Sequence, residues 1–291
     1  MIGQPPPATD KLLLHEILPA PGSDLYYAMV YVPGKTRSAL TVIESFRALV
    51  STLPWQCSTS EIALAKLAWW HEELHRLGSA EARHPLTRAL APFAARYSGM
   101  GEALFAVVNG TARLLTRGRF DTVAERHAYF AAIHAPLWQL HAMICGEENP
   151  ATLHDAAELG VTIEIAHAVR NLRRHISAEM AFICGDLLPV SASQSNDAEW
   201  YAALSALEIP RLVQALETTR HALASHATRA RGLRAQFTLT ALAIATLNEV
   251  AADGYRVWER RLELTPLRKW WLAWKSGVVI RSAVVATDRA G

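Results

Sequence analysis

Cysteine is scarce in this chain of 291 residues, which contains Cys57, Cys145 and Cys184 and no others. Their number is odd and they lie far apart, so they indicate neither a disulfide framework nor a CxxC metal site. Buried thiols in a reducing compartment are the better interpretation. We therefore expect a cytoplasmic protein that is either free or associated with a membrane surface.

Charge is also limited, and long apolar runs are missing. Charged residues make up 19% of the chain and the net charge is +2, which gives no strong overall attraction to nucleic acid. Basic residues are spread among acidic ones without an aromatic-rich stripe, so we expect no nucleic-acid partner. Pro5-Pro6-Pro7 interrupts the N-terminus, which is unlike a signal peptide. No window reaches the roughly 18–20 apolar residues of a membrane span.

Paired aspartates are the most informative absence. The eight aspartates of the chain are Asp10, Asp24, Asp121, Asp155, Asp186, Asp197, Asp253 and Asp288, and no two lie within four residues of each other. Neither DDxxD nor DxxxD therefore occurs. Carboxylates at positions i and i+4 share one face of a helix, an arrangement that suits Mg2+ ligation. The chain also lacks a P-loop, a GxGxxG fingerprint and a GxSxG elbow.

Apolar residues recur with the helical period along most of the chain, which is 51% hydrophobic. Two helices are indicated around 40–53 and 62–74. Further helices are predicted over about 85–97, 99–116, 121–146, 151–180, 196–207, 209–230, 233–264 and 266–283. Alternating runs typical of strands are scarce, and no repeat of 30–45 residues occurs. The prediction is an N-terminal extension over 1–22 followed by one all-α domain over 23–291.

The N-terminal third carries a series of landmarks in a characteristic order. They are Asp24-Leu25-Tyr26-Tyr27, Pro33, Arg37-Ser38-Ala39-Leu40, Glu44-Ser45-Phe46-Arg47, the run from Lys66 to Leu74, Gly78 and His84-Pro85-Leu86. Their order and spacing resemble the squalene/phytoene synthase family, and the resemblance extends over about residues 23–190. It implies a single isoprenoid-synthase-like helical bundle around a central cavity, with ligand sites built from facing helices.

Members of that family typically bind Mg2+ and substrate diphosphate through two aspartate-rich helix motifs. The resemblance places the first motif near Ser51-Thr52, in a run from Leu49 to Trp55 that has no carboxylate. Anchored on Leu159-Gly160, it places the second motif at Glu164, His167, Arg170, Asn171 and His175. A shifted register would use Arg174, His175 and Glu179 instead. We prefer the first register because it keeps both the glycine and the arginine.

The residues of the second motif share a helix face, which admits two interpretations. The first is a polar pocket lining that recognises a headgroup without a full metal cluster, and the second is a solvated or internally satisfied polar stripe. The resemblance adds Tyr27 and Arg37 as headgroup contacts, since Arg37 matches a family arginine that contacts diphosphate. It also implies Phe46, Tyr129 and Trp138 as cavity-lining residues. Trp138 stands where the family has a small residue, so it either fills part of a prenyl channel or repacks the core, and we favour the core.

Two further segments need an interpretation. His71, Glu72 and His75 match the HExxH pattern of zinc hydrolases, but an exposed, charged helix face is the preferred interpretation because no sheet is predicted to flank it.

Near the C-terminus, Trp270, Trp271 and Trp274 stand among basic residues. They either contact a membrane interface or pack on the core with Arg268, Lys269 and Lys275 outward, and we prefer core packing.

Together these features predict a squalene/phytoene synthase-like protein that binds an isoprenoid or related lipid without Mg2+-dependent ionisation of a diphosphate. Such a pseudoenzyme could serve lipid handling or assembly, so a protein partner is compatible with it, and no cofactor is expected. The alternative is an active prenyl transferase that requires Mg2+ and uses substituted residues, namely Arg37, Glu164, His167, Arg170, Asn171 and His175. A zinc hydrolase is the third hypothesis.

Overall fold

The computed structural model describes residues 19–117, 120–172, 184, 198–227, 232–257 and 259–287. Within these ranges the chain forms helices and no strand, apart from an isolated bridge between Phe120 and Cys184. This confirms the all-α prediction. None of the helices in the described ranges is both long enough and apolar enough to cross a bilayer. The predicted extension over 1–22 lies almost entirely outside the described residues.

The helices follow one another with short connections in the first half of the chain. They are α2 (Asp24–Met29), α3 (Gly34–Ser51), α4 (Leu53–Gln56), α5 (Ser60–His75), α6 (Pro85–Ala94), α7 (Met100–Arg117), α8 (Val123–Ile144), α9 (Pro150–Arg170), α11 (Ala198–His226), α12 (Arg234–Ala252) and α13 (Pro266–Thr287).

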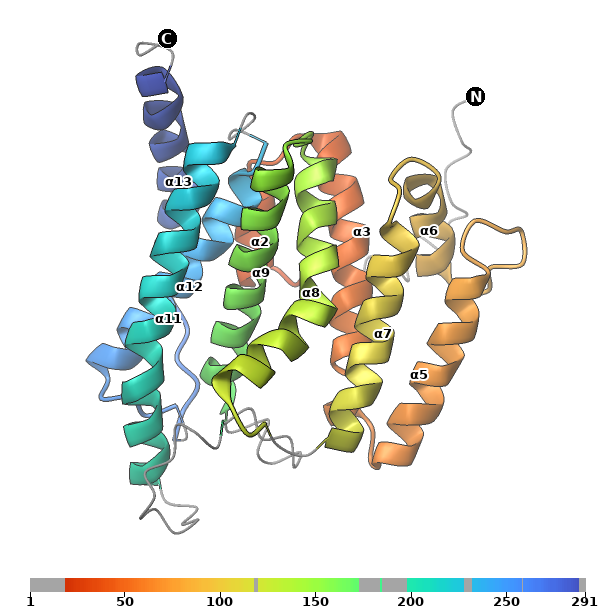
Figure 1. Ribbon diagram of the computed structural model, residues 1–291, viewed down its shortest axis with the longest axis horizontal. Helices are drawn as coiled ribbons and strands as arrows, with labels where there is room; N and C mark the ends of the chain where they lie inside the picture. Colours follow the sequence, from red (N-terminus) through yellow and green to blue (C-terminus); the bar gives the residue numbers. More distant parts are fainter. Residues whose placement is uncertain are drawn as a thin grey trace.

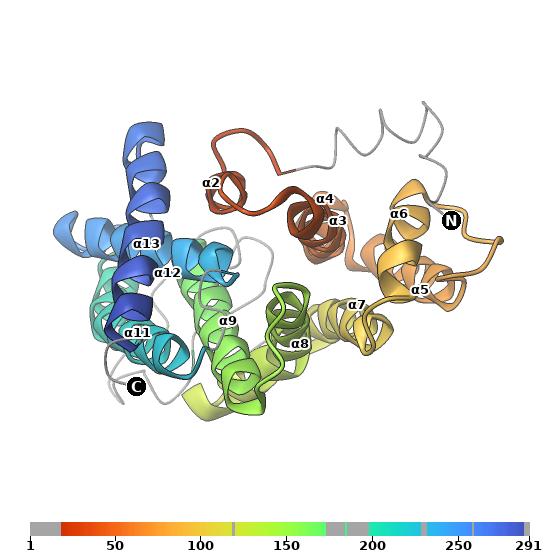
Figure 2. The ribbon, with the colours of Figure 1, turned by 90° about the horizontal axis from the view of Figure 1, so that it is seen from above.

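These helices form two layers with α12 and α13 at one end (Figure 1). Seen from above in Figure 2, α5, α7, α8, α9 and α11 follow one another in one layer, and each packs on the next. Helices α6, α3 and α2 lie opposite them, and α12 contacts both α9 and α2. Facing helices of the two layers can therefore present side chains to a space between them.

Side-chain caps determine where the central helices begin. Thr122 accepts a hydrogen bond from the backbone N–H of Glu125 at the start of α8, and Asn149 accepts one from Ala151 at the start of α9. Such caps satisfy N–H groups that the first helical turn leaves without a partner. Between the two helices, Gly146 has φ of 92°, a left-handed conformation that glycine adopts readily. The short turn places α8 and α9 side by side.

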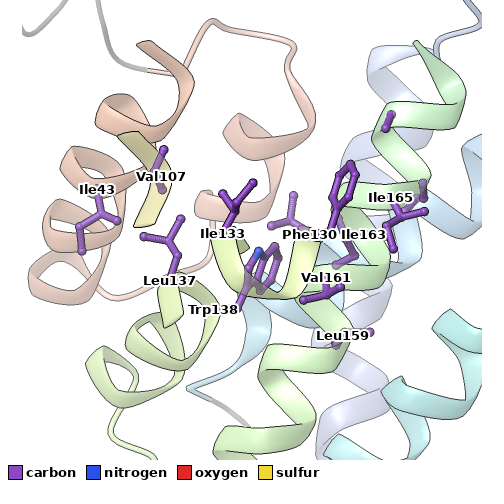
Figure 3. Close-up of a cluster of buried hydrophobic side chains, with 14 of the residues drawn as sticks. Ile43, Val107, Phe130, Ile133, Leu137, Trp138, Leu159, Val161, Ile163 and Ile165 are labelled. Atoms are coloured by element: carbon purple, nitrogen blue, oxygen red, sulfur yellow. The ribbon is translucent and has the colours of Figure 1, made fainter. Parts of the chain in front are cut away.

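Helix α8 approaches its neighbours very closely at two glycines. A Cβ on Gly110 of α7 would lie 2.2 Å from Ile133, and a Cβ on Gly160 of α9 would lie 1.9 Å from the Trp138 ring. In Figure 3 the Trp138 indole points from α8 towards α9, among the buried side chains of both helices. Trp138 is 2% exposed, so it belongs to the core, as we favoured from the sequence.

Three predicted helix extents are wrong. The helix expected over 151–180 ends at Arg170, because the C-cap residue Asn171 leaves the helical conformation, with φ of −101° and ψ of 22°. The helix expected over 233–264 ends at Ala252, because Gly254 and Tyr255 have φ values of 76° and 60°, which break the helix. The two helices expected over 196–207 and 209–230 are one helix, which continues through Pro210. The buried side chains of that helix continue with helical spacing on both sides of the proline, so packing outweighs the lost backbone hydrogen bond.

Helix α13 contradicts the expectation that its tryptophans pack on the core. Trp270, Trp271 and Trp274 are exposed, whereas Lys269 is 3% exposed. The reason is electrostatic: the Lys269 ammonium lies 2.8 Å from an Asp24 carboxylate oxygen and donates a hydrogen bond to the Gly22 carbonyl. These contacts fix the rotation of α13 about its axis and leave the indoles on the opposite side.

The close approach at Gly160 predicts that Gly160→Ala destabilises the protein by about 1–3 kcal/mol, because the new methyl group overlaps the Trp138 ring. Urea denaturation measures the change. Gly101→Ala on α7 is the matched control, since no atom lies within 4 Å of its added Cβ and a stabilising effect is expected there. With Trp138→Ala as the background, the cost of Gly160→Ala should fall. Equal costs in both backgrounds would contradict this packing.

Candidate functional site

A cavity of about 320 Å3 lies between the two layers. Its lining comes from α2, α3, α4, α7, α8 and α9, and from the segment between α12 and α13. The polar lining residues include Asp24, Arg47, Ser51, Thr52, Trp55, Tyr129, His134, Glu164, His167, Arg170, Asn171 and Arg261. Leu114, Phe130, Ile133 and Ala168 provide apolar surface.

Helix α9 supplies one wall of the cavity. Glu164, His167 and Arg170 from its last two turns line the cavity, together with the C-cap residue Asn171. The structure thus places four of the five predicted second-motif residues together at one cavity and not on a solvated face. Glu164 and Arg170 are also paired within the protein, so the internally satisfied alternative applies to these two. His175, the fifth, lies outside the described residues.

The facing wall carries the region where the family has its first aspartate motif. Ser51 at the end of α3 and Trp55 in α4 both line the cavity. Neither residue has a carboxylate, so this wall presents a hydroxyl group and an indole. The two motif regions therefore lie across one cavity, as the resemblance implies, with different chemistry on the first of them.

A buried ion cluster joins the two walls. Arg47 of α3 donates a hydrogen bond of 2.8 Å from Nε to Glu44, and its Nη1 lies 3.2 Å from Glu164 of α9. Burial alone would raise the pKa of the Glu164 carboxyl, but Arg47 and the nearby histidines outweigh that effect and hold its pKa well below the usual range. Glu164 therefore stays ionised, and its charge is already compensated by protein.

A second ion cluster stands at the edge of the cavity. Asp24 of α2 lies 3.0 Å from Arg170 and 2.8 Å from Lys269. Burial alone would raise the pKa of the Asp24 carboxyl. The hydrogen bond from Lys269 and the charge of Arg170 together lower this pKa by more, so its net shift is downward. Arg170 also donates from Nε to the Leu262 carbonyl. The carboxylate of Asp24 is thus compensated by two cations.

His134 of α8 is the polar group of the lining with hydrogen-bonding capacity to spare. Burial lowers the pKa of its imidazole to about 4, so the ring is neutral at pH 7. Within the described part of the chain, its Nδ1 is buried and has no hydrogen-bond partner. A buried polar atom of this kind usually has a partner, so it is suited to a ligand or a water molecule.

The donor set does not fit the magnesium cluster that the family implies. Mg2+ prefers octahedral coordination by hard oxygens. The two carboxylates that line the cavity, Glu164 and Asp24, are each bonded to protein cations. Across the ranges the structure describes, no group of three His, Cys, Asp or Glu side chains is placed to hold a metal ion.

The structure places the other predicted headgroup contacts elsewhere. Arg37 donates from Nε and Nη2 to the Val32 carbonyl at 3.1 and 2.9 Å, where it fixes the turn between α2 and α3. Neither Arg37 nor Tyr27 is among the residues that line the cavity. Of the predicted cavity-lining aromatics, Tyr129 lines it and donates from its hydroxyl to the Gly110 carbonyl. Phe46 is fully buried against the Trp70 ring.

The HExxH segment has a structural role in the last turns of α5. His71 and His75 both pack on the Phe105 ring, with centroid distances of 5.0 Å. The prediction of an exposed, charged helix face is wrong at Glu73, which lies between the two histidines and is fully buried. Its Oε1 accepts hydrogen bonds of 2.7 Å from the backbone N–H groups of Arg83 and His84. The segment thus anchors the connection from α5 to α6.

Sequence reasoning missed several lining residues, among them Arg47, His134 and Asp24. Helical spacing could have found the first two. Arg47 lies four residues before Ser51, and His134 lies four residues before Trp138, so each shares a helix face with a position already implicated. Asp24 carried no such signal, because its cavity position depends on the packing of α2 against α12 and α13.

A larger hollow of about 520 Å3 lies elsewhere, between α8, α9 and α11. Two ion pairs lie in its lining, Arg126 with Glu208 and His127 with Glu158. None of the predicted site residues lines it. The cavity between the two layers is therefore the better candidate site.

Comparisons with known proteins agree with this architecture. The family model for squalene/phytoene synthase matches residues 18–268. A dehydrosqualene synthase structure superposes with a TM-score of 0.75 at 12% identity, covering 94% of this chain and 97% of that one. The squalene synthase HpnC from Alicyclobacillus acidocaldarius gives a TM-score of 0.69 at 17% identity, with coverages of 85% and 95%. A search of curated proteins found no significant match.

The depressed pKa of His134 predicts a pH-dependent stability. Between about pH 6.5, where an unfolded histidine titrates, and about pH 4, the unfolded chain binds a proton that the folded chain does not. The free energy of unfolding should therefore be constant above this window and fall by roughly 3 kcal/mol as the pH drops through it. Urea denaturation at a series of pH values measures the slope.

His134→Phe should flatten this slope, because it removes the group that must stay neutral. His154→Gln is the control, since His154 is exposed. Burial also lowers the pKa of His141, so part of the slope should remain in the His134 variant. Identical slopes for the wild type and His134→Phe would show that His134 is not buried in its neutral form.

Proposed function

Because the chain belongs to the squalene/phytoene synthase family, we propose that it binds an isoprenoid or a related lipid in the cavity between α3 and α9 without ionising a diphosphate. The family model matches most of the chain, and the two solved structures share its fold. A shared fold does not carry an activity with it, so the proposal depends on the chemistry of the cavity.

The observation that carries the proposal is the state of the carboxylates. Ionisation of a prenyl diphosphate needs metal ions that neutralise the departing pyrophosphate, and those ions need several free oxygen ligands. In this cavity, Glu164 is compensated by Arg47, and Asp24 is compensated by Arg170 and Lys269. The first-motif wall offers Ser51 and Trp55 instead of carboxylates. A cavity whose carboxylates are all paired with protein cations is suited to binding a lipid and not to ionising a prenyl diphosphate.

The remaining polar groups suit a headgroup that is neutral or carries one charge. His134 is neutral and has a buried nitrogen available for a hydrogen bond. The Asn171 amide donates to the His167 carbonyl, which leaves its oxygen as a possible acceptor. Small-molecule cavities span about 300–1,000 Å3, so this one holds a headgroup and the adjacent part of a chain. Phe130 and Ile133 provide apolar surface for that chain.

Native mass spectrometry of protein purified from its own host tests the binding role. A lipid adduct is expected on the wild type and should be lost from Ser51→Phe, which places a ring in the cavity. Ala215→Phe is the matched control, because Ala215 lines the separate hollow at α11 and that variant should keep the adduct. Both variants must keep the wild-type helical circular dichroism. Absence of any adduct from the wild type, or equal retention by Ser51→Phe, would argue against a lipid in this cavity.

The metal prediction separates this role from an active prenyl transferase. Calorimetry with Mg2+ and a farnesyl diphosphate thio-analogue should show binding no tighter than about millimolar, because free hard oxygens are too few. A squalene/phytoene synthase with intact aspartate motifs serves as the positive control. Tight, metal-dependent binding would favour the transferase.

A pair of substitutions extends this test to turnover. Asn171→Asp together with His175→Asp would give the chain two aspartates four residues apart, which is the DxxxD spacing that the resemblance assigns to the second motif. The first-motif wall would still lack them at Ser51 and Trp55, so prenyl diphosphate turnover should remain absent. Turnover by this double variant alone would show that the first motif is dispensable.

A further inference from the structure

Helix α13 presents an unusual surface, because its large apolar side chains face outward. Leu267 is 75% exposed, and Trp270, Trp271 and Trp274 are 46%, 46% and 49% exposed. These four positions are spaced i, i+3, i+4 and i+7, which places them on one face of the helix, here called the tryptophan face. The buried side of α13 holds Lys269, Ala273 and Ser276 instead. A helix that packs on a core ordinarily has the opposite arrangement.

The charges on α13 itself have one sign. The sequence of α13, from Pro266 to Thr287, contains four basic residues and no acidic one. Lys269 is buried against Asp24, and Arg268 pairs with Glu249 of α12, so both of these cations are compensated by acidic groups. Lys275 is exposed and lies 4.9 Å from the centre of the Trp271 ring. Exposed indoles beside the Lys275 ammonium therefore form the surface, which favours a negatively charged partner.

We propose that the tryptophan face of α13 docks on the surface of an anionic lipid bilayer. Indole suits the boundary between headgroups and acyl chains, because it is apolar over most of its area and has one polar N–H. Adjacent lysine and arginine side chains attract anionic headgroups. The four exposed apolar side chains follow one face of α13, so the helix axis would lie along the bilayer surface. Three indoles beside cations, with no acidic group on the helix, fit this occupant better than the mixed-charge rim of a protein interface.

The docking surface is directly connected to the cavity. Lys269, on the opposite side of α13 from the tryptophan face, bonds to Asp24, and Asp24 lines the cavity and bonds to Arg170. One layer of ion pairs therefore separates the docked helix from the cavity wall. Binding to the bilayer would hold the cavity close to the phase in which isoprenoids and other lipids dissolve.

Co-sedimentation with lipid vesicles tests the proposal. The full chain should bind vesicles of phosphatidylcholine and phosphatidylglycerol mixed at roughly 3:1, and should bind pure phosphatidylcholine at least about ten-fold more weakly. Binding should also weaken at high salt, because salt screens the attraction of the basic side chains. The triple variant Trp270→Ala, Trp271→Ala and Trp274→Ala should lose binding by about ten-fold or more.

Trp69→Ala is the matched control, since Trp69 of α5 is also exposed, at 40%, and its loss should leave vesicle binding unchanged. Brominated phosphatidylcholine in the anionic vesicles should quench the fluorescence of the wild type more strongly than that of the triple variant. Ser51→Phe should bind vesicles like the wild type, so a failure of the lipid-cavity proposal would remain separate from a failure of docking. Circular dichroism verifies that each variant is folded.

Three results would overturn the proposal. One is equal vesicle binding by the wild type and the folded triple variant, and another is equal quenching of the two. The third is a wild type that fails to bind vesicles but forms a dimer in light scattering, with the triple variant monomeric. That result would identify the tryptophan face as an interface between copies of the chain.

Discussion

The interaction on which the site depends is the ion cluster of Arg47 with Glu44 and Glu164. It connects α3 of one layer to α9 of the other across the cavity, and His141 of α8 contacts Glu44 at 3.2 Å. Two buried carboxylates this close to one another would be unfavourable without the guanidinium between them. Arg47 therefore pairs with both carboxylates, and it holds the pKa of the Glu164 carboxyl well below its usual range. The same contact that holds the two layers in register also occupies the oxygen atoms that a metal-dependent enzyme would use.

The second cluster repeats this principle at the edge of the cavity. Asp24, Arg170 and Lys269 come from α2, α9 and α13, so three segments far apart in the sequence meet there. Ion pairs in such a place are a weak argument for stability, because the desolvation of each charge offsets much of the attraction. Their clearer effect is geometric. They fix the rotation of α13 and thereby determine which of its residues face outward.

The fold could be predicted almost completely from the sequence, because helical periodicity and the ordered landmarks both report local constraints. The end of α12 was missed although Asp253-Gly254 is a local stop signal, since apolar residues with helical spacing continue beyond it and only Gly254, with φ of 76°, marks the break. In the site, the cavity-lining residues of α9 could be predicted, because Glu164, His167 and Asn171 are spaced by three or four residues along one helix face. Arg37 was preferred to Arg47 because the resemblance named it, yet its guanidinium caps a turn at Val32. The outward direction of the α13 tryptophans depends on the ion pair between Lys269 and Asp24, which are far apart in the sequence. Helical periodicity cannot predict such a contact.

The contact between Gly160 and Trp138 also makes the order of changes at the two positions matter. A tryptophan at position 138 fits best beside a residue without a Cβ, whereas a glycine at position 160 accepts a smaller residue opposite it equally well. Replacing Trp138 first removes the ring before a side chain is added at position 160. The reverse order passes through the overlapping pair, so packing alone makes one of the two mutational routes the less strained one.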